Sequence, residues 1–168
     1  MDPPFYEFLP RWLAGQPWYG GRGRPRPIGF LRLQDPAGEV GIETHIVAEA
    51  GVTYQLPLTY RGRPLPGVTA IATSWHSELG RRWIYDGEPD PVWQQVYRSL
   101  ITEHQQVESN SGTELQVSAW GFGPAAVAPG TVVAVRRLKS ETPSSGSSGV
   151  MGRWAGLTEG VLARWQCR

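Results

Sequence analysis

The stretch EVGIETHIVAEA, residues 39–50, alternates apolar and polar side chains over most of its length. In an extended chain one face would carry apolar side chains, those of Val40, Ile42, Ile46 and Ala48. The opposite face would carry polar side chains, those of Glu39, Glu43, His45 and Glu49. A period of two residues is typical of a β-strand with one face in a core and the other in water. The stretch therefore predicts such a strand, which needs neighbouring strands to form a sheet.

Residues on both sides of this strand predict neighbours for it in a sheet. Ile28–Leu33 is short and apolar, and the turn signal DPAG at residues 35–38 joins it to the strand as a hairpin. Three further stretches have the pattern of strands, namely Thr53–Tyr60, Val68–Trp75 and Leu79–Asp86. Because the connections between them are short, neighbouring strands are expected to run antiparallel. The sequence thus predicts a curved, mainly antiparallel sheet of four or five strands.

Two stretches have the pattern of helices. The first, Pro4–Ala14, carries large apolar side chains three and four residues apart and is followed by Gly15. The second begins at Asp90 and Pro91, a residue type that caps helices followed by one that favours the first helical position. Its apolar stripe is formed by Val92, Trp93, Val96, Tyr97, Leu100, Ile101, His104 and Val107. We therefore expect an α+β fold, with one long helix packed on the sheet and a short N-terminal helix.

The remainder of the chain predicts further strands and a connector. Glu114–Trp120 and Thr131–Leu138 have the pattern of strands that could return to the sheet. Residues 140–150 are rich in Ser and Gly and poor in apolar side chains, so we expect a flexible linker there. Residues 151–168 are again apolar enough to pack back on the domain that residues 1–139 are expected to form.

Length and charge limit the class of the protein. A chain of 168 residues suits one domain, and its net charge of +1 is too small for a strongly electrostatic binder of nucleic acids. No apolar run approaches the ~20 residues that span a bilayer. Cys167 is the single cysteine, and residues 1–13 lack the basic and apolar regions of an export signal. We therefore expect a cytoplasmic protein with no internal disulfide and no membrane contact.

Few residues have the spacing of a catalytic or metal site. Glu43 and His45 share one strand face and could act as an acid–base pair or as two metal ligands, but a solvated sheet face also explains them. His76, Ser77 and Glu78 have the residue types of a hydrolytic triad. Adjacent residues of a strand point to opposite faces, however, so these three cannot form a relay. We expect no catalytic residue, no metal and no cofactor.

The segment Arg22-Gly23-Arg24-Pro25 has the residues of an AT-hook, in which a flat Arg-Gly-Arg unit enters a narrow minor groove of DNA. Such hooks are usually repeated in a disordered basic tail, whereas this one occurs once, between aromatic residues. Glycines and prolines at this density also favour a bend that leads into a strand. Binding of nucleic acid through these arginines therefore remains an alternative to a structural corner.

Three motifs carry a resemblance to a known family. They are RWLAGQPWYGGRGR at residues 11–24, YQLPLTYRGRPLPG at residues 54–67 and HSELGRRWIYDGEPDPVW at residues 76–93. The first is similar to the signature that opens the N-terminal cap domain of bacterial maltokinases and related actinobacterial aminosugar kinases. The other two are similar to segments of stand-alone cap-like proteins. The resemblance covers roughly residues 4 to 140 and implies an α+β module of the kind that precedes a kinase-like catalytic body.

This resemblance implies a function without catalysis. The catalytic Asp, its Asn partner and the metal-binding Asp of the kinase body have no counterpart, so we expect no phosphoryl transfer by this chain. We expect a regulatory or docking role on a sugar kinase, a trehalose synthase or another enzyme of trehalose, maltose or glycogen metabolism. The expected docking residues are those of the motifs, Trp18, Tyr19, Gly20, Gly21, Arg22, Gly23, Arg24, Arg81, Arg82, Trp83, Tyr85 and Asp86.

A small-ligand site or an enzymatic pocket is the alternative of a different class. A curved sheet could enclose a pocket in which aromatic side chains surround one polar group. The candidate residues are Tyr54, Tyr60, Trp75 and Trp83, with Glu43 or His45 as the polar group. Convergence of these side chains on one cavity would favour this alternative.

Overall fold

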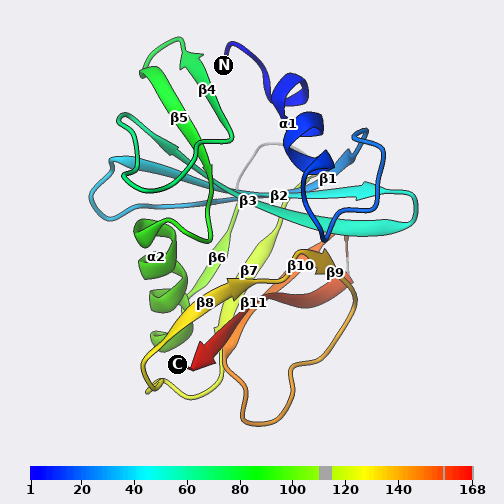
Figure 1. The fold of residues 1–168 in the computed structure, drawn as a ribbon. Helices are drawn as coiled ribbons and strands as arrows, with labels where there is room; N and C mark the ends of the chain where they lie inside the picture. The colour runs from blue at the N-terminus through cyan, green and yellow to red at the C-terminus, as the bar shows by residue number, and fades with distance from the viewer. Residues whose placement is uncertain (110–114, 157, 168) are drawn as a thin grey trace.

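The computed structural model describes residues 1–109, 115–156 and 158–167, and these form two antiparallel sheets and two helices (Figure 1). Sheet A contains β1 Arg26–Leu33, β2 Val40–Glu49, β3 Val52–Arg61, β4 Ala72–His76, β5 Gly80–Asp86 and the short β9 Arg137–Leu138. Its strands lie in the order β1-β2-β3-β5-β4, and β9 pairs with β3. Sheet B contains β6 Gln106–Glu108, β7 Ser118–Phe122, β8 Gly130–Ala134, β10 Gly149–Trp154 and β11 Thr158–Cys167. Its order is β6-β7-β10-β11-β8.

The hairpin of β1 and β2 confirms the strand predicted at residues 39–50. In the turn between the two strands, the Asp35 carboxylate accepts hydrogen bonds from the backbone N–H groups of Ala37, Glu39 and Val40 at 3.0, 3.0 and 2.9 Å. Gly38 takes a φ of 69° there, a conformation that glycine adopts without strain. Because the turn fixes the register, the apolar side chains of Val40, Ile42 and Ile46 in β2 all enter the same core.

Both predicted helices are present. α1, Phe5–Ala14, packs Leu9 and Leu13 on one face of sheet A, against Val47, Tyr54 and Leu56. α2, Pro91–Thr102, begins at Asp90, whose side chain accepts a hydrogen bond from the backbone N–H of Val92 at 2.9 Å. Neither of these two helices of the described chain combines the length and the apolar character needed to cross a lipid bilayer.

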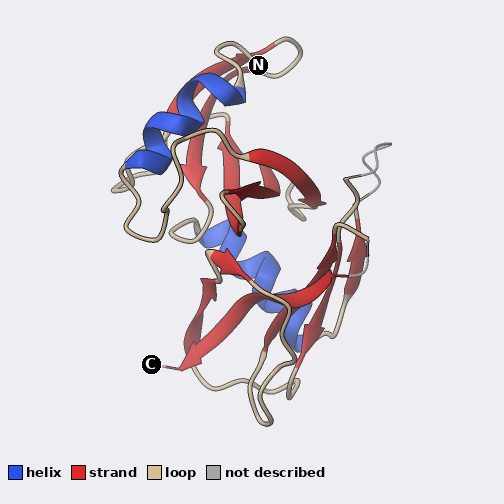
Figure 2. Ribbon diagram, turned by 90° about the vertical axis from the view of Figure 1, so that its right-hand side faces the viewer, coloured by secondary structure: helices blue, strands red, loops and turns tan. Residues whose placement is uncertain are grey.

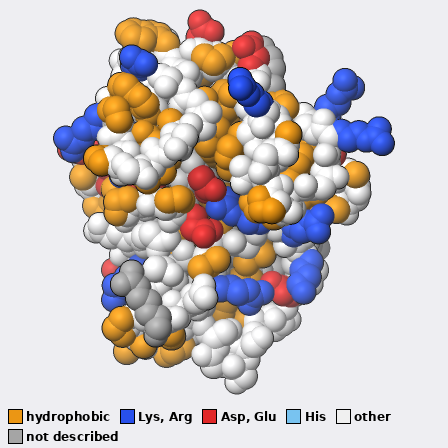
Figure 3. Space-filling model, in the orientation of Figure 1, with side chains coloured by type: hydrophobic (Ala, Val, Ile, Leu, Met, Phe, Trp, Pro, Cys, Tyr) orange, Lys and Arg blue, Asp and Glu red, His pale blue; other side chains and the backbone are white. Residues whose placement is uncertain are grey.

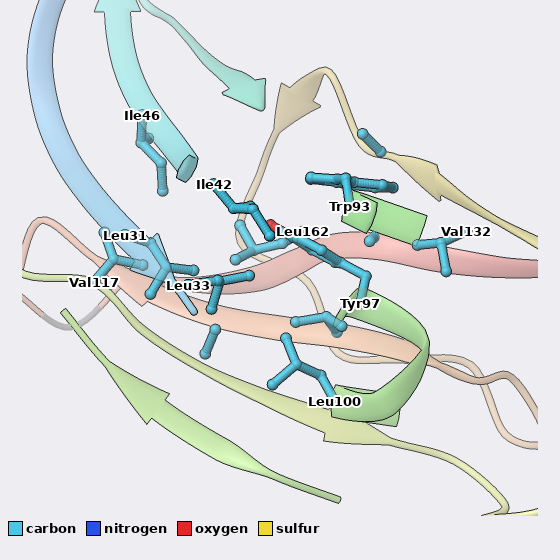
Figure 4. Packing of buried hydrophobic residues seen from close by; sticks show 14 of the residues in the cluster. Leu31, Leu33, Ile42, Ile46, Trp93, Tyr97, Leu100, Val117, Val132 and Leu162 are labelled. Atoms are coloured by element: carbon cyan, nitrogen blue, oxygen red, sulfur yellow. The ribbon is translucent and has the colours of Figure 1, made fainter. Parts of the chain in front are cut away.

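The main core lies on the other face of sheet A, where α2 and sheet B cover it (Figure 2). Figure 4 shows side chains of three sources meeting there, which are the pair β1–β2, helix α2 and sheet B. Trp93 and Tyr97 stack with ring centroids 4.1 Å apart, and the Tyr97 hydroxyl lies 2.9 Å from the hydroxyl of Thr44. A single apolar cluster therefore joins the two sheets.

The prediction of one sheet with one long helix is wrong. α2 ends at Thr102, and Val107, which the helical stripe included, lies in β6. The strands after α2 pair with one another as sheet B, and of the predicted strand Thr131–Leu138 only β9 returns to sheet A. Both edges of sheet A already have neighbours, since Asp2 bridges to Trp75 of β4 and Gln116 to Phe30 of β1. Glu114, the first residue of the predicted strand Glu114–Trp120, lies outside the described residues, and β7 begins at Ser118.

Residues 139–148 connect β9 to β10. Within this connector Glu141 forms ion pairs with Lys139 at 3.6 Å and with Arg164 of β11 at 2.6 Å. The carbonyl of Ser148 accepts a hydrogen bond from the backbone N–H of Trp165 at 2.8 Å. Within residues 151–168, residues 151–154 belong to β10 and residues 158–167 to β11, while Leu157 and Arg168 are not described. The division into a domain, a flexible linker and a C-terminal segment stays a prediction.

Candidate functional site

The loop at residues 18–24 forms a corner between α1 and β1, and Glu49 at the end of β2 holds it. The Glu49 carboxylate accepts hydrogen bonds from the backbone N–H groups of Arg22 and Arg24 at 2.7 and 3.2 Å, and from the hydroxyl of Tyr19. The Tyr19 hydroxyl in turn accepts a hydrogen bond from the backbone N–H of Gly23 at 3.0 Å. One carboxylate therefore fixes the backbone of the whole arginine-bearing turn.

Steric contacts explain why two positions of this corner are occupied by glycine. A Cβ at Gly21 would collide with the Glu49 carboxylate and the Tyr19 ring. Gly23 has a φ of 79°, and a Cβ there would lie 3.0 Å from the Cβ of Pro10 in α1. The glycines thus allow the loop to approach both the helix and the carboxylate, which confirms a folded bend at this motif.

The electrostatics of Tyr19 and Glu49 agree with this geometry. Burial raises the pKa of Tyr19 to about 12, and its hydrogen bond to Glu49 acts in the same direction. Partial burial acts to raise the pKa of Glu49, but the hydrogen bonds from Tyr19 and from the backbone of Arg22 and Arg24 outweigh it. The pKa of Glu49 therefore lies below its ordinary value, and the carboxylate is ionised near neutral pH.

Aromatic rings anchor the corner to sheet A. The Trp18 ring lies 5.8 Å from that of Trp12 in α1 and 6.2 Å from that of Tyr54 in β3, and the Tyr19 ring lies 4.9 Å from that of Tyr54. The backbone N–H of Gly20 donates to the Tyr54 hydroxyl at 3.2 Å. Tyr54 is itself buried, so the loop is attached to a side chain that belongs to the α1-side core.

The arginines of the corner point away from these anchors. Arg22 and Arg24 are both exposed, and their guanidinium groups make no hydrogen bond or ion pair with the part of the chain that the structure describes. Figure 3 shows basic side chains projecting on the side of the molecule where Figure 1 places the loop between α1 and β1. A fixed backbone that carries two unpaired guanidinium groups can bind a carboxylate or phosphate group of a partner.

The other residues expected to dock lie in β5 and have mainly structural contacts. They are Arg81, Arg82, Trp83, Tyr85 and Asp86. Arg81 lies over the Trp83 ring at 4.8 Å, and the Arg82 guanidinium donates to the carbonyl of Leu79 at 2.9 Å. The buried Tyr85 accepts a hydrogen bond on its hydroxyl from the backbone N–H of Leu65 at 2.8 Å. These contacts fix the β4–β5 hairpin and the loop before β4.

Arg136 links the two motifs, although no local pattern in the sequence marks it. Its guanidinium donates to both carboxylate oxygens of Asp86 at 2.8 Å and to Glu88 at 3.2 Å, and it lies over the Trp18 ring at 5.4 Å. Asp86 and Trp18 belong to separate motifs of the sequence. Their common contact with Arg136 ties the corner to the residues that follow β5.

Only some of the residues expected to line a pocket lie together, since the Tyr60 hydroxyl is 3.5 Å from the His45 ring nitrogen. Glu43 and His45 are neighbours, with the His45 ring nitrogen 3.3 Å from the carboxylate. Tyr54 contacts the corner instead, and Trp75 on β4 is 60% exposed. A hollow of about 590 Å³ beside α1 and one of about 370 Å³ beside residues 61–63 are lined by other residues. Neither of these two hollows of the described chain is lined by Glu43, His45, Tyr54 or Trp75, and a ligand pocket in the curved sheet stays a prediction.

His45 itself lies in an aromatic environment under α1. Its ring stacks on Phe5 with centroids 4.6 Å apart and meets Phe30 edge to face at 5.2 Å. Burial acts to raise the pKa of Glu43, but the hydrogen bond from His45 and the charges of His45 and Arg32 lower it below its ordinary value. These contacts place the pair in the packing of α1 on sheet A.

The remaining chemical candidates are a hydrolytic triad, a metal site and a DNA hook, and the residues of the first and third have structural contacts. His76 Nδ1 accepts hydrogen bonds from the backbone N–H groups of Glu78 and Leu79 at 3.2 and 3.3 Å, so it closes the β4–β5 turn. The described residues contain no group of three acidic, His or Cys side chains that could hold a metal ion. The backbone of Arg22 and Arg24, bound to Glu49, differs from the flat segment of an AT-hook.

Residues 12–90 match the family model of the maltokinase N-terminal cap domain. The match confirms the resemblance seen in the motifs, over a shorter range than residues 4 to 140. It begins within α1, contains β1 to β5 and ends at Asp90, the residue that caps α2. No curated protein and no solved structure matches the chain. The matched range thus contains every strand of sheet A except β9.

Proposed function

We propose, from the maltokinase N-terminal cap sequence at residues 12–90, that the protein is a non-catalytic cap-like module that docks on another enzyme. The proposed partner is a sugar kinase, a trehalose synthase or a glucan enzyme of trehalose, maltose or glycogen metabolism. The proposed docking site is the corner at residues 18–24. Its partner surface is acidic, because the exposed charges of the corner are guanidinium groups.

The observation that carries this proposal is the rigid display of Arg22 and Arg24. Their backbone N–H groups are bound to Glu49, while their side chains project from the corner without a partner among the described residues. A fixed backbone lowers the entropy lost on binding, which is the usual benefit of a preorganised site. Arginine is also among the residue types that contribute most to protein interfaces.

A binding experiment with purified proteins tests the docking role. Candidate enzymes of the three classes are immobilised, and the affinity of the protein is measured against that of the double variant Arg22→Ser, Arg24→Ser. Loss of two charged hydrogen-bonding groups predicts a decrease in affinity of at least about tenfold. The matched control is Arg63→Ser, because Arg63 is 80% exposed on its side chain and lies outside the corner.

A second variant separates the arginine side chains from the frame that holds them. Glu49→Ala leaves both arginines in place but removes the acceptor of their backbone hydrogen bonds. We expect weaker binding from this variant as well, with a smaller effect than that of the double variant. Binding by no candidate enzyme, or equal binding by the wild type and the double variant, would refute docking through the corner.

A further inference from the structure

We propose that the hollow beside α1 is a binding site for a neutral sugar, a pyranose in monosaccharide or disaccharide form. This hollow has a volume of about 590 Å³ and is open to solvent. Its size falls within the roughly 300–1,000 Å³ that is typical of small-molecule sites. None of its lining residues belongs to the corner at residues 18–24, so the proposal does not depend on the docking function.

The hollow combines an apolar floor with polar groups at its rim. Phe8 and Trp12 from α1 and Ile71 from the segment before β4 supply apolar surface. Glu7, Arg11 and Gln16 supply a carboxylate, a guanidinium and an amide. A pyranose has the matching chemistry, because its C–H groups form an apolar face and its hydroxyl groups can both donate and accept hydrogen bonds.

The aromatic side chains of the hollow are held in position by neighbouring rings. Phe8 meets Phe5 edge to face with centroids 5.5 Å apart, and Trp12 meets Trp18 in the same way at 5.8 Å. These contacts limit the rotation of both rings before a ligand arrives. A ring fixed in this way loses little entropy on binding.

The opposite wall is held by backbone hydrogen bonds. The N–H of Ile71 donates to the carbonyl of Ile84 in β5 at 2.7 Å. The carbonyl of Pro3, which also lines the hollow, accepts a hydrogen bond from the hydroxyl of Ser74 at 2.9 Å. Both walls of the hollow are therefore attached to sheet A, one through α1 and the other through β4 and β5.

The polar groups select a neutral ligand. Glu7 and Arg11 are exposed, and neither side chain has a hydrogen bond or an ion pair within the described residues. Their charges cancel, so the rim does not favour an anion or a cation, while together they offer donors and acceptors to hydroxyl groups. Gln16 donates its amide N–H to the carbonyl of Trp12 at 3.2 Å, which leaves its amide oxygen as a further acceptor.

The test is an NMR titration of the full chain labelled with ¹⁵N. Glucose and maltose are the probes, and glucose 6-phosphate and glycerol are the comparison ligands. We expect saturable shifts of the Trp12 indole N–H and of the backbone of Phe8 and Ile71, with millimolar dissociation constants for the two neutral sugars. We expect glucose 6-phosphate to bind more weakly than glucose and glycerol to give no saturable shift.

Variants decide whether the rim groups bind the sugar. Glu7→Gln with Arg11→Gln lies at exposed helix positions and is expected to weaken binding at least about fivefold, with an unchanged melting temperature. Glu39→Gln with Arg63→Gln is the matched control, because these residues form another exposed acid–arginine pair, at 3.6 Å. The corner variant Arg22→Ser, Arg24→Ser should bind the sugars normally. The proposal is overturned by the absence of saturable shifts, by equal affinity of the rim variant, or by stronger binding of glucose 6-phosphate or glycerol.

Discussion

Replacement of Asp90 by alanine should reveal how firmly the cap sequence is joined to the rest of the protein. Asp90 is fully buried, and its carboxylate accepts hydrogen bonds from Arg61 Nε and Nη2 at 2.6 Å each and from the Thr59 hydroxyl at 2.8 Å. It also accepts the bond from Val92 that caps α2. Asp90→Ala removes all of these together, and so separates β3 from the start of α2.

The expected loss of stability follows from these contacts. Removing one partner of a buried ion pair costs about 3–5 kcal/mol, and loss of a helix cap costs about 1 kcal/mol. The Arg61 side chain is 12% exposed, so water can partly solvate the guanidinium group that the variant leaves unpaired. We therefore expect a loss of about 3 kcal/mol, which corresponds to a decrease of roughly 10 °C in the melting temperature of a chain of this size. Asp90→Asn, which retains an oxygen acceptor but loses the charge, should lose about 2 kcal/mol.

The dependence on pH gives the same prediction a second test. Burial acts to raise the pKa of Asp90, but the hydrogen bonds from Arg61, Thr59 and Val92 outweigh it and hold the pKa below its ordinary value. The stabilisation by Asp90 is therefore fully present above its unfolded pKa of about 4 and is lost as the pH falls through its lower folded pKa. The difference in stability between the wild type and Asp90→Ala should be constant near neutral pH and shrink in acid.

Urea unfolding followed by tryptophan fluorescence measures both effects. Near neutral pH the variant should unfold at a lower urea concentration than the wild type, and the two curves should approach each other in acid. A loss of only about 1 kcal/mol at neutral pH would mean that capping alone contributes, and a large contribution from the buried ion pair would be refuted. A difference that grows in acid would contradict the direction of the pKa.

Two further substitutions test the fold at single positions. Gly23→Ala should destabilise the protein by about 1–2 kcal/mol in urea unfolding and more than Gly38→Ala, because both glycines have positive φ but only Gly23 has a neighbour within 4 Å of the added carbon. The Gln94 amide forms hydrogen bonds with both the N–H and the carbonyl of Val132 at the outer edge of β8, at 2.8 Å each. Gln94→Ala leaves these two backbone groups unpaired, so it should destabilise the protein by about 1–3 kcal/mol. An unpaired strand edge also promotes association between molecules, so light scattering should show more aggregation. Aggregation no greater than that of the wild type would show that this edge does not need the amide.

The strands of sheet A can be predicted because their signals are local. The predicted strands Ile28–Leu33 and Thr53–Tyr60 correspond to Arg26–Leu33 and Val52–Arg61, since turn residues and alternation both act within a few positions. The prediction Val68–Trp75 is less accurate, because β4 occupies Ala72–His76. The first part of that prediction forms a loop whose Val68 N–H bonds to the carbonyl of Leu65.

Sheet B could not be predicted because its strands pair across segments that are far apart in the sequence. β10 pairs with β7 on one side and with β11 on the other, and the Ser- and Gly-rich composition around residues 140–150 conceals the start of β10 at Gly149. Four successive residues of β11, Gly160 to Ala163, are buried, so period-two alternation is absent there. A buried strand of this kind has no solvent face from which it could be recognised.

The candidate site is predictable only as far as its motif. The motif identifies the arginines and glycines of the corner, but the alternation of residues 39–50 places Glu49 merely among the polar residues of a solvated strand face. Arg136 has no local pattern at all, although it joins Asp86 to Trp18. Both Glu49 and Arg136 act through contacts more than twenty positions away in the sequence, which periodicity and spacing do not report.

The surfaces that remain free on sheet A limit where a partner can bind. α1 covers one broad face of the sheet, and α2 with sheet B covers the other. Two exposed features outside these covered faces are the corner with Arg22 and Arg24, and the end of the β4–β5 hairpin, where Trp75 and Leu79 are each 60% exposed. Binding at the corner would be electrostatic and would weaken as salt is added, whereas binding at the hairpin would be mainly apolar and nearly independent of salt. The salt dependence of the affinity for a partner therefore distinguishes the two surfaces before any variant is made.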